Sequence, residues 1–342
     1  MRNTWRRIAG PVLSIASIVA LTLGATACSG SEQSDELLIY NAQHESLTKE
    51  WIDAFTKETG IKVTYRQGGD TELGNQLVAE GAASPADVFL TENSPAMAAV
   101  EQADLFADVA ADTIKQVPAQ YRPATGKWTG VAARTTVFAY NTTKLRPEQL
   151  PKSLLDLQQP TWKGRWGAPP AKADFQAIVA ALLALKGEPA TAQWLAGMKT
   201  NAVAYKDNIA TLKAVNTGEV EGGVIYHYYW FRDQAKAKEI SGNTALHYFG
   251  NGDPGAFLSL SGGGVLKSSK KQQQAQQFLH FVTSKAGQEV LQQGTSFEYP
   301  VASDVPANPA LKPLSELHPP AVDPSDLDAK KVSDLMTAAG LL

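Results

Sequence analysis

Two adjacent tyrosines, Tyr228 and Tyr229, follow a short apolar run, 223–226, that predicts a buried strand. A phenol has an ordinary pKa of about 10, so only a strong local positive charge ionises it at neutral pH. The ionised phenolate is a hard oxygen donor, which suits a small, highly charged cation such as ferric iron. Neighbours on a regular strand point to opposite faces, so both rings can face one metal only if the backbone turns where the strand ends. Composition alone favours the alternative, in which the aromatic residues 226–231 belong to the core.

Polar side chains also follow two other predicted strands. His44 comes after the apolar run at 37–40, and Glu92 and Asn93 come after the run at 87–90. Ligands of parallel α/β sheets bind beyond the carboxyl ends of the strands. The strand ends therefore offer one imidazole, one carboxylate and two phenols as candidate donors.

The elements that must position these donors alternate between strand and helix, which predicts an α/β fold. Residues 36–90 read as a βαβαβ unit with parallel strands. Its strands are expected at 37–40, 61–65 and 87–90, and its helices at 46–59 and 71–81. Further on we expect helices at 175–185, 190–198 and 270–284. Two β-rich runs, 135–140 and 256–260, interrupt this pattern, and we interpret them as two crossings between two lobes that share a hinge.

The N-terminus has the pattern of a secretory signal. Three arginines, Arg2, Arg6 and Arg7, precede an uncharged stretch from Ile8 to Ser31. Small residues lead to Cys28, and this site resembles the bacterial lipobox, which implies cleavage after residue 27 and lipidation of the Cys28 thiol. Residues 28–35 then read as a flexible tether. The alternative is an uncleaved anchor, because the uncharged stretch is just long enough to span a bilayer.

Composition excludes several classes of protein. The chain has 342 residues, of which 31 are Lys or Arg and 34 are Asp or Glu, so it lacks the basic surface of a nucleic-acid binder. Removing residues 1–27 takes away three arginines and moves the net charge from -3 to -6. A single cysteine allows neither an internal disulfide nor a cysteine metal knuckle. The sequence also has no GxSxG, HExxH or P-loop motif, which makes a secreted hydrolase the weakest alternative.

Four segments resemble the periplasmic ferric-iron-binding proteins, which are the substrate-binding components of iron(III) ABC importers. The resemblance extends along essentially the whole chain after residue 27, and the four segments occur in the family's order. They are Tyr40–His44 (YNAQH), Ser84–Phe89 (SPADVF) followed by Glu92, Tyr228–Trp230 (YYW) and Asp253–Ala256 (DPGA).

The resemblance implies a metal site whose donors come from both lobes. His44 and Glu92 would bind Fe³⁺ from the first lobe, and Tyr228 and Tyr229 from the second. In this family a synergistic anion such as phosphate or carbonate, or water, fills the two remaining positions of an octahedron. The candidate anion-binding residues are Asn93, Arg134, Lys172, Ala173 and Asn208. Lys172 would attract an anion to the helix that begins near Phe175, whereas Asp174 would oppose it unless it caps that helix.

The resemblance also implies a two-lobed periplasmic-binding-protein (Venus-flytrap, type II) fold with two β hinge crossings. We expect lobe 1 to comprise residues 36–135 and 259–309, and lobe 2 residues 136–258 and 310–342. The expected protein is a monomer without enzyme activity, lipid-anchored to the bacterial cell membrane on its periplasmic side or outer surface. It would take ferric iron or a small ferric chelate to an ABC permease and its ATPase. The alternative within the same fold is a binding protein for an organic anion or a polyamine.

Overall fold

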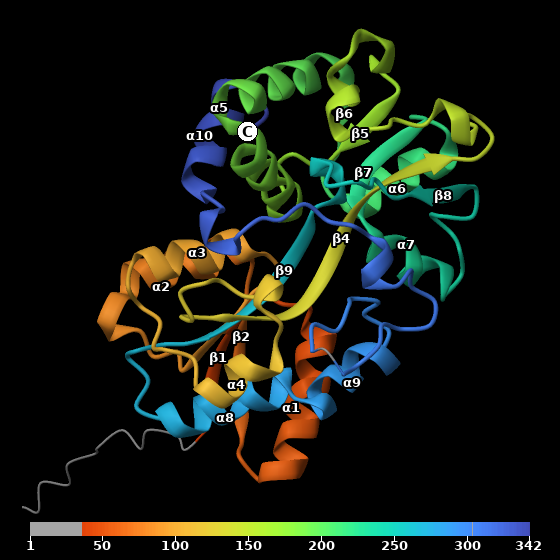
Figure 1. The fold of residues 1–342 in the computed structure, drawn as a ribbon. Coiled ribbons are helices and arrows are strands. Elements are labelled where there is room, and N and C mark those ends of the chain that lie inside the picture. Colours follow the sequence, from red (N-terminus) through yellow and green to blue (C-terminus); the bar gives the residue numbers. More distant parts are fainter. Residues whose placement is uncertain (1–35, 303) are drawn as a thin grey trace, which may run out of the picture. The chain divides into compact units, whose positions relative to one another are not determined.

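A nine-stranded sheet runs through the part of the chain that the computed structural model describes, residues 36–302 and 304–342 (Figure 1). The order of its strands is β2-β1-β3-β9-β4-β7-β5-β6, and β8 pairs with β4 beside this path. The strands are β1 (Leu37–Asn41), β2 (Val63–Gln67), β3 (Val88–Leu90), β4 (Thr129–Asn141), β5 (Trp166–Ala168), β6 (Ala202–Ala204), β7 (Gly222–Tyr226), β8 (Thr244–His247) and β9 (Leu258–Val265). The predicted cysteine anchor and signal segment lie outside the described residues.

Ten helices accompany these strands in the described residues. They are α1 (Glu45–Thr59), α2 (Asp70–Glu80), α3 (Ser94–Gln102), α4 (Ala111–Gln116), α5 (Ala173–Asn201), α6 (Asn208–Thr217), α7 (His227–Gln234), α8 (Gln272–Thr283), α9 (Lys285–Gln293) and α10 (Ala329–Ala338). None of the described helices is both long and apolar enough to cross a membrane.

The predicted βαβαβ unit is confirmed. Strand β1 pairs in parallel with β2 on one side and with β3 on the other. Helix α1 ends at Gly60, whose φ of 75° lies in the left-handed region that glycine adopts without strain. Helices α1, α8 and α9 cover one face of these strands around Trp51 and Phe278, and α2 and α3 cover the other face around Leu73 and Met97 (Figure 1).

Both β-rich crossings are confirmed as strands, although their limits differ from the prediction. Strand β4 begins at Thr129, earlier than expected, and pairs antiparallel with β9 through Thr135. From Thr136 onward β4 pairs with β7 instead, and through Phe138–Asn141 also with β8. Strand β9 begins only at Leu258, because Pro254–Ala256 form a 3-10 turn, η6, whose first residue follows the capping side chain of Asp253.

The second half of the sheet is formed by β7, β5 and β6, which run parallel to one another. Helix α5 packs against them and contains Gly187 with a φ of 77°, so the helix is interrupted between the two helices that the sequence predicted. Helix α10 packs on α5 through Val332 and Met336. Helix α7 follows β7 without a loop, and this junction holds the two predicted tyrosine ligands.

Candidate metal centre

Tyr228 and Tyr229 lie in the first turn of α7, which begins at His227 directly after β7. Successive residues of an α-helix are about 100° apart around the axis, compared with 180° on a strand. The two rings therefore point to the same side, with centroids 4.2 Å apart and planes inclined at 31°. The helical turn thus supplies the change of backbone direction that a shared metal requires.

Both tyrosine hydroxyls point at one carboxylate oxygen, Oδ2 of Asp174. Tyr229 donates to this oxygen at 3.0 Å and Tyr228 at 3.4 Å. Asp174 lies in the first turn of α5 and is buried. The same Oδ2 accepts a bond from Asn208 Nδ2 at 2.8 Å, and Oδ1 accepts one from Asn93 Nδ2 at 2.9 Å. Four hydrogen-bond donors therefore converge on the Asp174 carboxylate. From the sequence, Asp174 was considered only for its effect on a bound anion.

His44 and Glu92 lie beside the tyrosines. The His44 ring meets the Tyr228 ring edge-on, with centroids 5.0 Å apart. His44 Nε2 lies 3.6 Å from Glu92 Oε1. The structure therefore brings together all four predicted ligands and Asp174, and we call these five residues the donor cluster.

Behind His44 and Glu92 lies a buried ion-pair network centred on Arg134 of β4. Arg134 Nη1 lies 3.3 Å from Glu92 Oε2, and Nη2 lies 2.6 Å from Glu298 Oε2. Glu298 Oε1 in turn lies 3.0 Å from His44 Nδ1. Burial alone would raise the pKa of Glu298, but Arg134 and His44 hold that pKa well below its ordinary value.

Asn93 connects the donor cluster to a second buried carboxylate. Its Nδ2 group donates to Asp70 Oδ2 at 2.9 Å as well as to Asp174, so both of its N–H bonds are directed at carboxylates. Asp70 begins α2 and also accepts a bond from the Glu92 backbone N–H at 2.9 Å. Burial raises the pKa of Asp70 to about 6, against the lowering effect of its bond from Asn93.

Burial also dominates the acid–base properties of the donor cluster. It raises the pKa of Glu92 to about 7, although His44 and Arg134 oppose this shift. The pKa values of Tyr228 and Tyr229 lie well above 10, first because of burial and then because of the Asp174 charge. For His44, burial favours the neutral ring, but Glu92 and Glu298 outweigh it and raise the pKa. The unmetallated cluster therefore holds protons that a cation would have to displace.

Two further predicted anion-binding residues, Lys172 and Ala173, lie beside the donor cluster. Lys172 and Ala173 line a cavity of about 290 Å³ that also reaches Asn208, Glu92 and Tyr229. The Lys172 side chain is exposed and precedes the first residue of α5. This cavity gives the donor cluster access from solvent.

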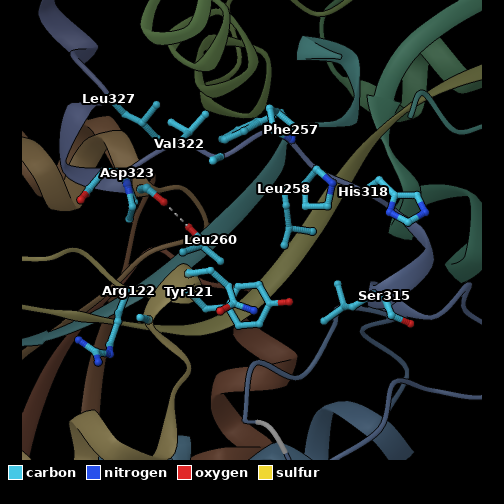
Figure 2. Close-up of a pocket in the computed structure, with 18 residues that line it drawn as sticks. Tyr121, Arg122, Phe257, Leu258, Leu260, Ser315, His318, Val322, Asp323 and Leu327 are labelled. Carbon is cyan, nitrogen blue, oxygen red and sulfur yellow. Dashed lines mark hydrogen bonds between the residues drawn. The ribbon is translucent and has the colours of Figure 1, made fainter. Parts of the chain in front are cut away.

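The larger cavity of about 600 Å³ is separate, because none of the predicted ligands lines it. Figure 2 shows Tyr121 and Arg122 on one side of it and Val322, Asp323 and Leu327 on the other, with Leu258 and Leu260 of β9 between them. Ser94, which follows Asn93, belongs to its wall. The larger cavity therefore offers no phenolate or imidazole of the donor cluster to a metal.

Sequence reasoning missed Asp70 and Glu298. Glu298 is separated from His44 by 254 residues and lies in a segment with no periodic pattern, so no spacing signal links the two.

Within the described residues, no group of three or more His, Cys, Asp or Glu side chains could hold a metal by itself. Any metal bound here would depend on the tyrosines.

Comparisons with known proteins agree with this fold. Residues 83–324 match the family model described as bacterial extracellular solute-binding protein. The chain is 60% identical to the Fe(3+)-binding periplasmic protein of Serratia marcescens over 97% of its own length and 98% of the relative's. It is 35% identical to the major ferric iron-binding protein of a Neisseria meningitidis serogroup A strain, over 90% and 93% of the two chains.

Solved structures of iron-binding proteins have the same fold as this chain. The iron-bound HitA structure from Pseudomonas aeruginosa superimposes with a TM-score of 0.84 at 42% identity, over 90% of this chain and 99% of that one. A Trichodesmium protein solved in complex with iron and citrate ligands superimposes with a TM-score of 0.80 at 26% identity, over 90% and 100%.

The chain therefore belongs to the bacterial extracellular solute-binding proteins, with their two-lobed type II fold. Within them it belongs to the periplasmic ferric-iron-binding proteins, as its sequence predicted. These relatives are named for binding iron rather than for catalysis, which agrees with the expectation that the chain is not an enzyme.

Proposed function

We propose that this protein captures Fe³⁺ between its two lobes with His44, Glu92, Tyr228 and Tyr229. The observation that carries the proposal is the convergence of both tyrosine hydroxyls on one oxygen of Asp174, beside His44 and Glu92. A cation entering here replaces the hydroxyl protons and gains two phenolates at once. The names of the relatives, which refer to ferric iron, support the same cargo.

The charge of the donor cluster favours a trivalent cation. With both phenols ionised, Tyr228, Tyr229, Glu92 and Asp174 would carry four negative charges around the metal. Fe³⁺ compensates three of them, whereas a divalent cation leaves a larger buried excess. Phenolate and carboxylate oxygens are also the hard donors that suit ferric iron.

We further propose that Asp174 supplies from within the chain part of what an external anion supplies in related sites. Its carboxylate already accepts the Asn93 and Asn208 amides, two of the groups that the sequence assigned to a phosphate or carbonate. It also lies in the first turn of α5, where the helix dipole favours negative charge. Asp174 would fill one of the two remaining positions, and water or a small anion near Lys172 and Ala173 the other.

Closure of the lobes around iron follows from where the donors originate. We assign residues 36–135 and 259–309 to lobe 1, and 136–258 and 310–342 to lobe 2. The exchange of β4 partners between Thr135 and Thr136 supports a hinge at that point. His44 and Glu92 then belong to lobe 1, and Asp174 and both tyrosines to lobe 2. Only the closed state offers iron all donors, so iron stabilises closure.

We also propose that the protein acts as a monomer that hands iron to an ABC permease with its ATPase. Residues 1–27 would be removed as a signal peptide, and a lipid on Cys28 would hold the protein at the cell membrane through the tether 28–35. Membership of the extracellular solute-binding family supports this location outside the cytoplasm.

Colour tests the proposed cargo directly. Ferric tyrosinate absorbs visible light by charge transfer, so purified protein mixed with ferric citrate turns reddish and retains iron after gel filtration. Tyr229→Phe weakens both the colour and iron retention, because only the Tyr228 phenolate remains, whereas Tyr205→Phe, whose hydroxyl bonds Glu219 outside the donor cluster, keeps them. A colourless wild-type protein without bound iron overturns the proposal and leaves the organic-solute alternative.

A further inference from the structure

Glu298 contacts His44 on the side of the ring that faces away from Glu92. Glu298 Oε1 lies 3.0 Å from His44 Nδ1, while His44 Nε2 faces Glu92 at 3.6 Å. Gln43 Oε1 lies at 3.0 Å from the same Nδ1 and also accepts the His44 backbone N–H at 2.7 Å. An ionised carboxylate can only accept hydrogen bonds, so Nδ1 carries the hydrogen and the lone pair of the neutral ring lies on Nε2.

Glu298 is itself held rigidly. Its side chain is fully buried, and its Oε2 accepts a bond from Arg134 Nη2 at 2.6 Å and lies 3.3 Å from both Gln43 Nε2 and Ser261 Oγ. The next residue, Tyr299, exchanges two backbone bonds with Ala133 of β4, at 2.8 and 2.9 Å. Both the carboxylate and its backbone are therefore fixed to a hinge strand.

We propose that Glu298 is a positioning residue for iron binding, which holds the His44 ring so that Nε2 faces the metal. This inference rests on the proposed function, because it assumes that His44 is a ligand. A carboxylate that accepts the second N–H of a histidine ligand fixes the ring's tautomer and orientation and makes it a better donor. The edge-on contact with Tyr228 also restricts the His44 ring.

Two substitutions separate this role from the charge of Glu298. Glu298→Asp keeps the charge opposite Arg134 but is shorter by one carbon–carbon bond, about 1.5 Å, so it no longer reaches His44. Glu298→Gln keeps the reach and loses the charge. We expect Glu298→Asp to lower iron affinity about 10- to 100-fold and to shift the tyrosinate band to longer wavelength, because a poorer histidine donor leaves iron more electron-deficient. Glu298→Gln retains an acceptor for Nδ1–H, but the acceptor is neutral and therefore weaker, so we expect a smaller loss of affinity and a smaller band shift than for Glu298→Asp.

The decisive measurement is a double-mutant cycle with His44→Gln. If Glu298 acts through His44, Glu298→Asp changes iron affinity by less than about threefold in the His44→Gln protein. An equal loss in both backgrounds, or no loss in either, overturns the proposal. Glu101→Gln serves as a matched control, because Glu101 bonds the Trp128 indole N–H outside the donor cluster. Thermal unfolding of each metal-free variant shows whether it is folded. A colourless wild type would instead contradict the proposed function itself.

Discussion

Asp174 and Tyr229 are joined by a hydrogen bond of 3.0 Å from the tyrosine hydroxyl to Oδ2 of the carboxylate. The same oxygen lies 3.4 Å from the Tyr228 hydroxyl. In the protein without metal, the two hydroxyl protons thus lie between the tyrosine oxygens and the Asp174 carboxylate. Iron that replaces these protons would contact the Asp174 carboxylate. Because this carboxylate belongs to the chain itself, we expect iron binding to depend less on an external anion.

Asp174→Asn tests that dependence. The variant keeps the size of the side chain but removes a negative charge beside the tyrosine oxygens. Loss of a residue that only supports a ligand lowers metal affinity by about 10- to 100-fold. Because we propose that Asp174 contacts the metal itself, we expect iron affinity to fall by more than about 100-fold. Added phosphate should then restore part of the affinity, because it can bind at the position near Lys172 and Ala173 and supply the missing negative charge.

The measurement is a ferric titration followed by the tyrosinate band, with and without phosphate. Asp207→Asn is the matched control, because Asp207 lines the same cavity but its Oδ1 caps α6 by accepting the Ala210 N–H. Wild-type protein that requires phosphate for tight binding, or Asp174→Asn that binds as tightly as wild type, would contradict the internal-anion role.

Iron binding should release protons in a number that depends on pH. Tyr228 and Tyr229 have raised pKa values and are protonated in the metal-free protein near neutral pH, so iron displaces about two protons at pH 8. The pKa of Glu92 is raised to about 7, so below that pH a third proton has to leave. The raised pKa of His44 adds to this increase. Iron affinity therefore falls more steeply with each pH unit below 7 than above it.

Calorimetry in buffers with different ionisation enthalpies counts the released protons. We expect the count to rise from about two to between three and four as the pH falls from 8 to 6. Glu92→Gln should flatten this rise and also weaken binding at pH 8. A constant count between pH 5 and 8 would argue against both His44 and Glu92 as ligands.

The residue patterns of the sequence predicted the α/β order, whereas the four ligands were implied by the family resemblance and stay a prediction. Donors that follow parallel strands meet at one edge of a sheet, and the parallel pair β1 and β3 places His44 and Glu92 accordingly. Strand β7 is connected to β3 through three antiparallel pairings, by way of β9 and β4, so this rule does not account for the position of Tyr228. The length of β4 could not be predicted, because a charged residue such as Arg134 is unusual inside a buried strand. The buried Arg134 guanidinium is stabilised by its ion pairs with Glu92 and Glu298, and Glu298 lies 164 residues away from it along the chain.

The DPGA segment supported the family resemblance, but its contacts in the structure are structural. Asp253 Oδ1 accepts the Gly255 N–H at 2.7 Å and the Leu154 N–H at 3.0 Å, which ties η6 to the short helix η4 (Leu154–Gln158). Asp253→Ala should therefore lower the free energy of unfolding by about 1–2 kcal/mol. Urea denaturation measures this loss. Iron affinity should stay unchanged, and a parallel fall in affinity would show that the segment also influences the site.

Arg134 should contribute strongly to stability as well as to the site. Its side chain is fully buried between Glu92 and Glu298, so Arg134→Met leaves the Glu298 carboxylate without its cationic partner. Breaking a buried ion pair in this way costs about 3–5 kcal/mol. Neutralising the carboxylate in the double variant Arg134→Met/Glu298→Gln should recover part of the loss, since the stranded charge is then gone.

Denaturant unfolding of the metal-free proteins measures both effects. Arg165→Met is the control, because the Arg165–Glu221 pair is about one third exposed and its loss should cost about 1 kcal/mol or less. If Arg134→Met and Arg165→Met destabilise the protein equally, the network behind His44 and Glu92 is not the buried, strongly coupled one described above. A double variant less stable than Arg134→Met would lead to the same conclusion, because neutralising an unpaired buried charge should stabilise the fold.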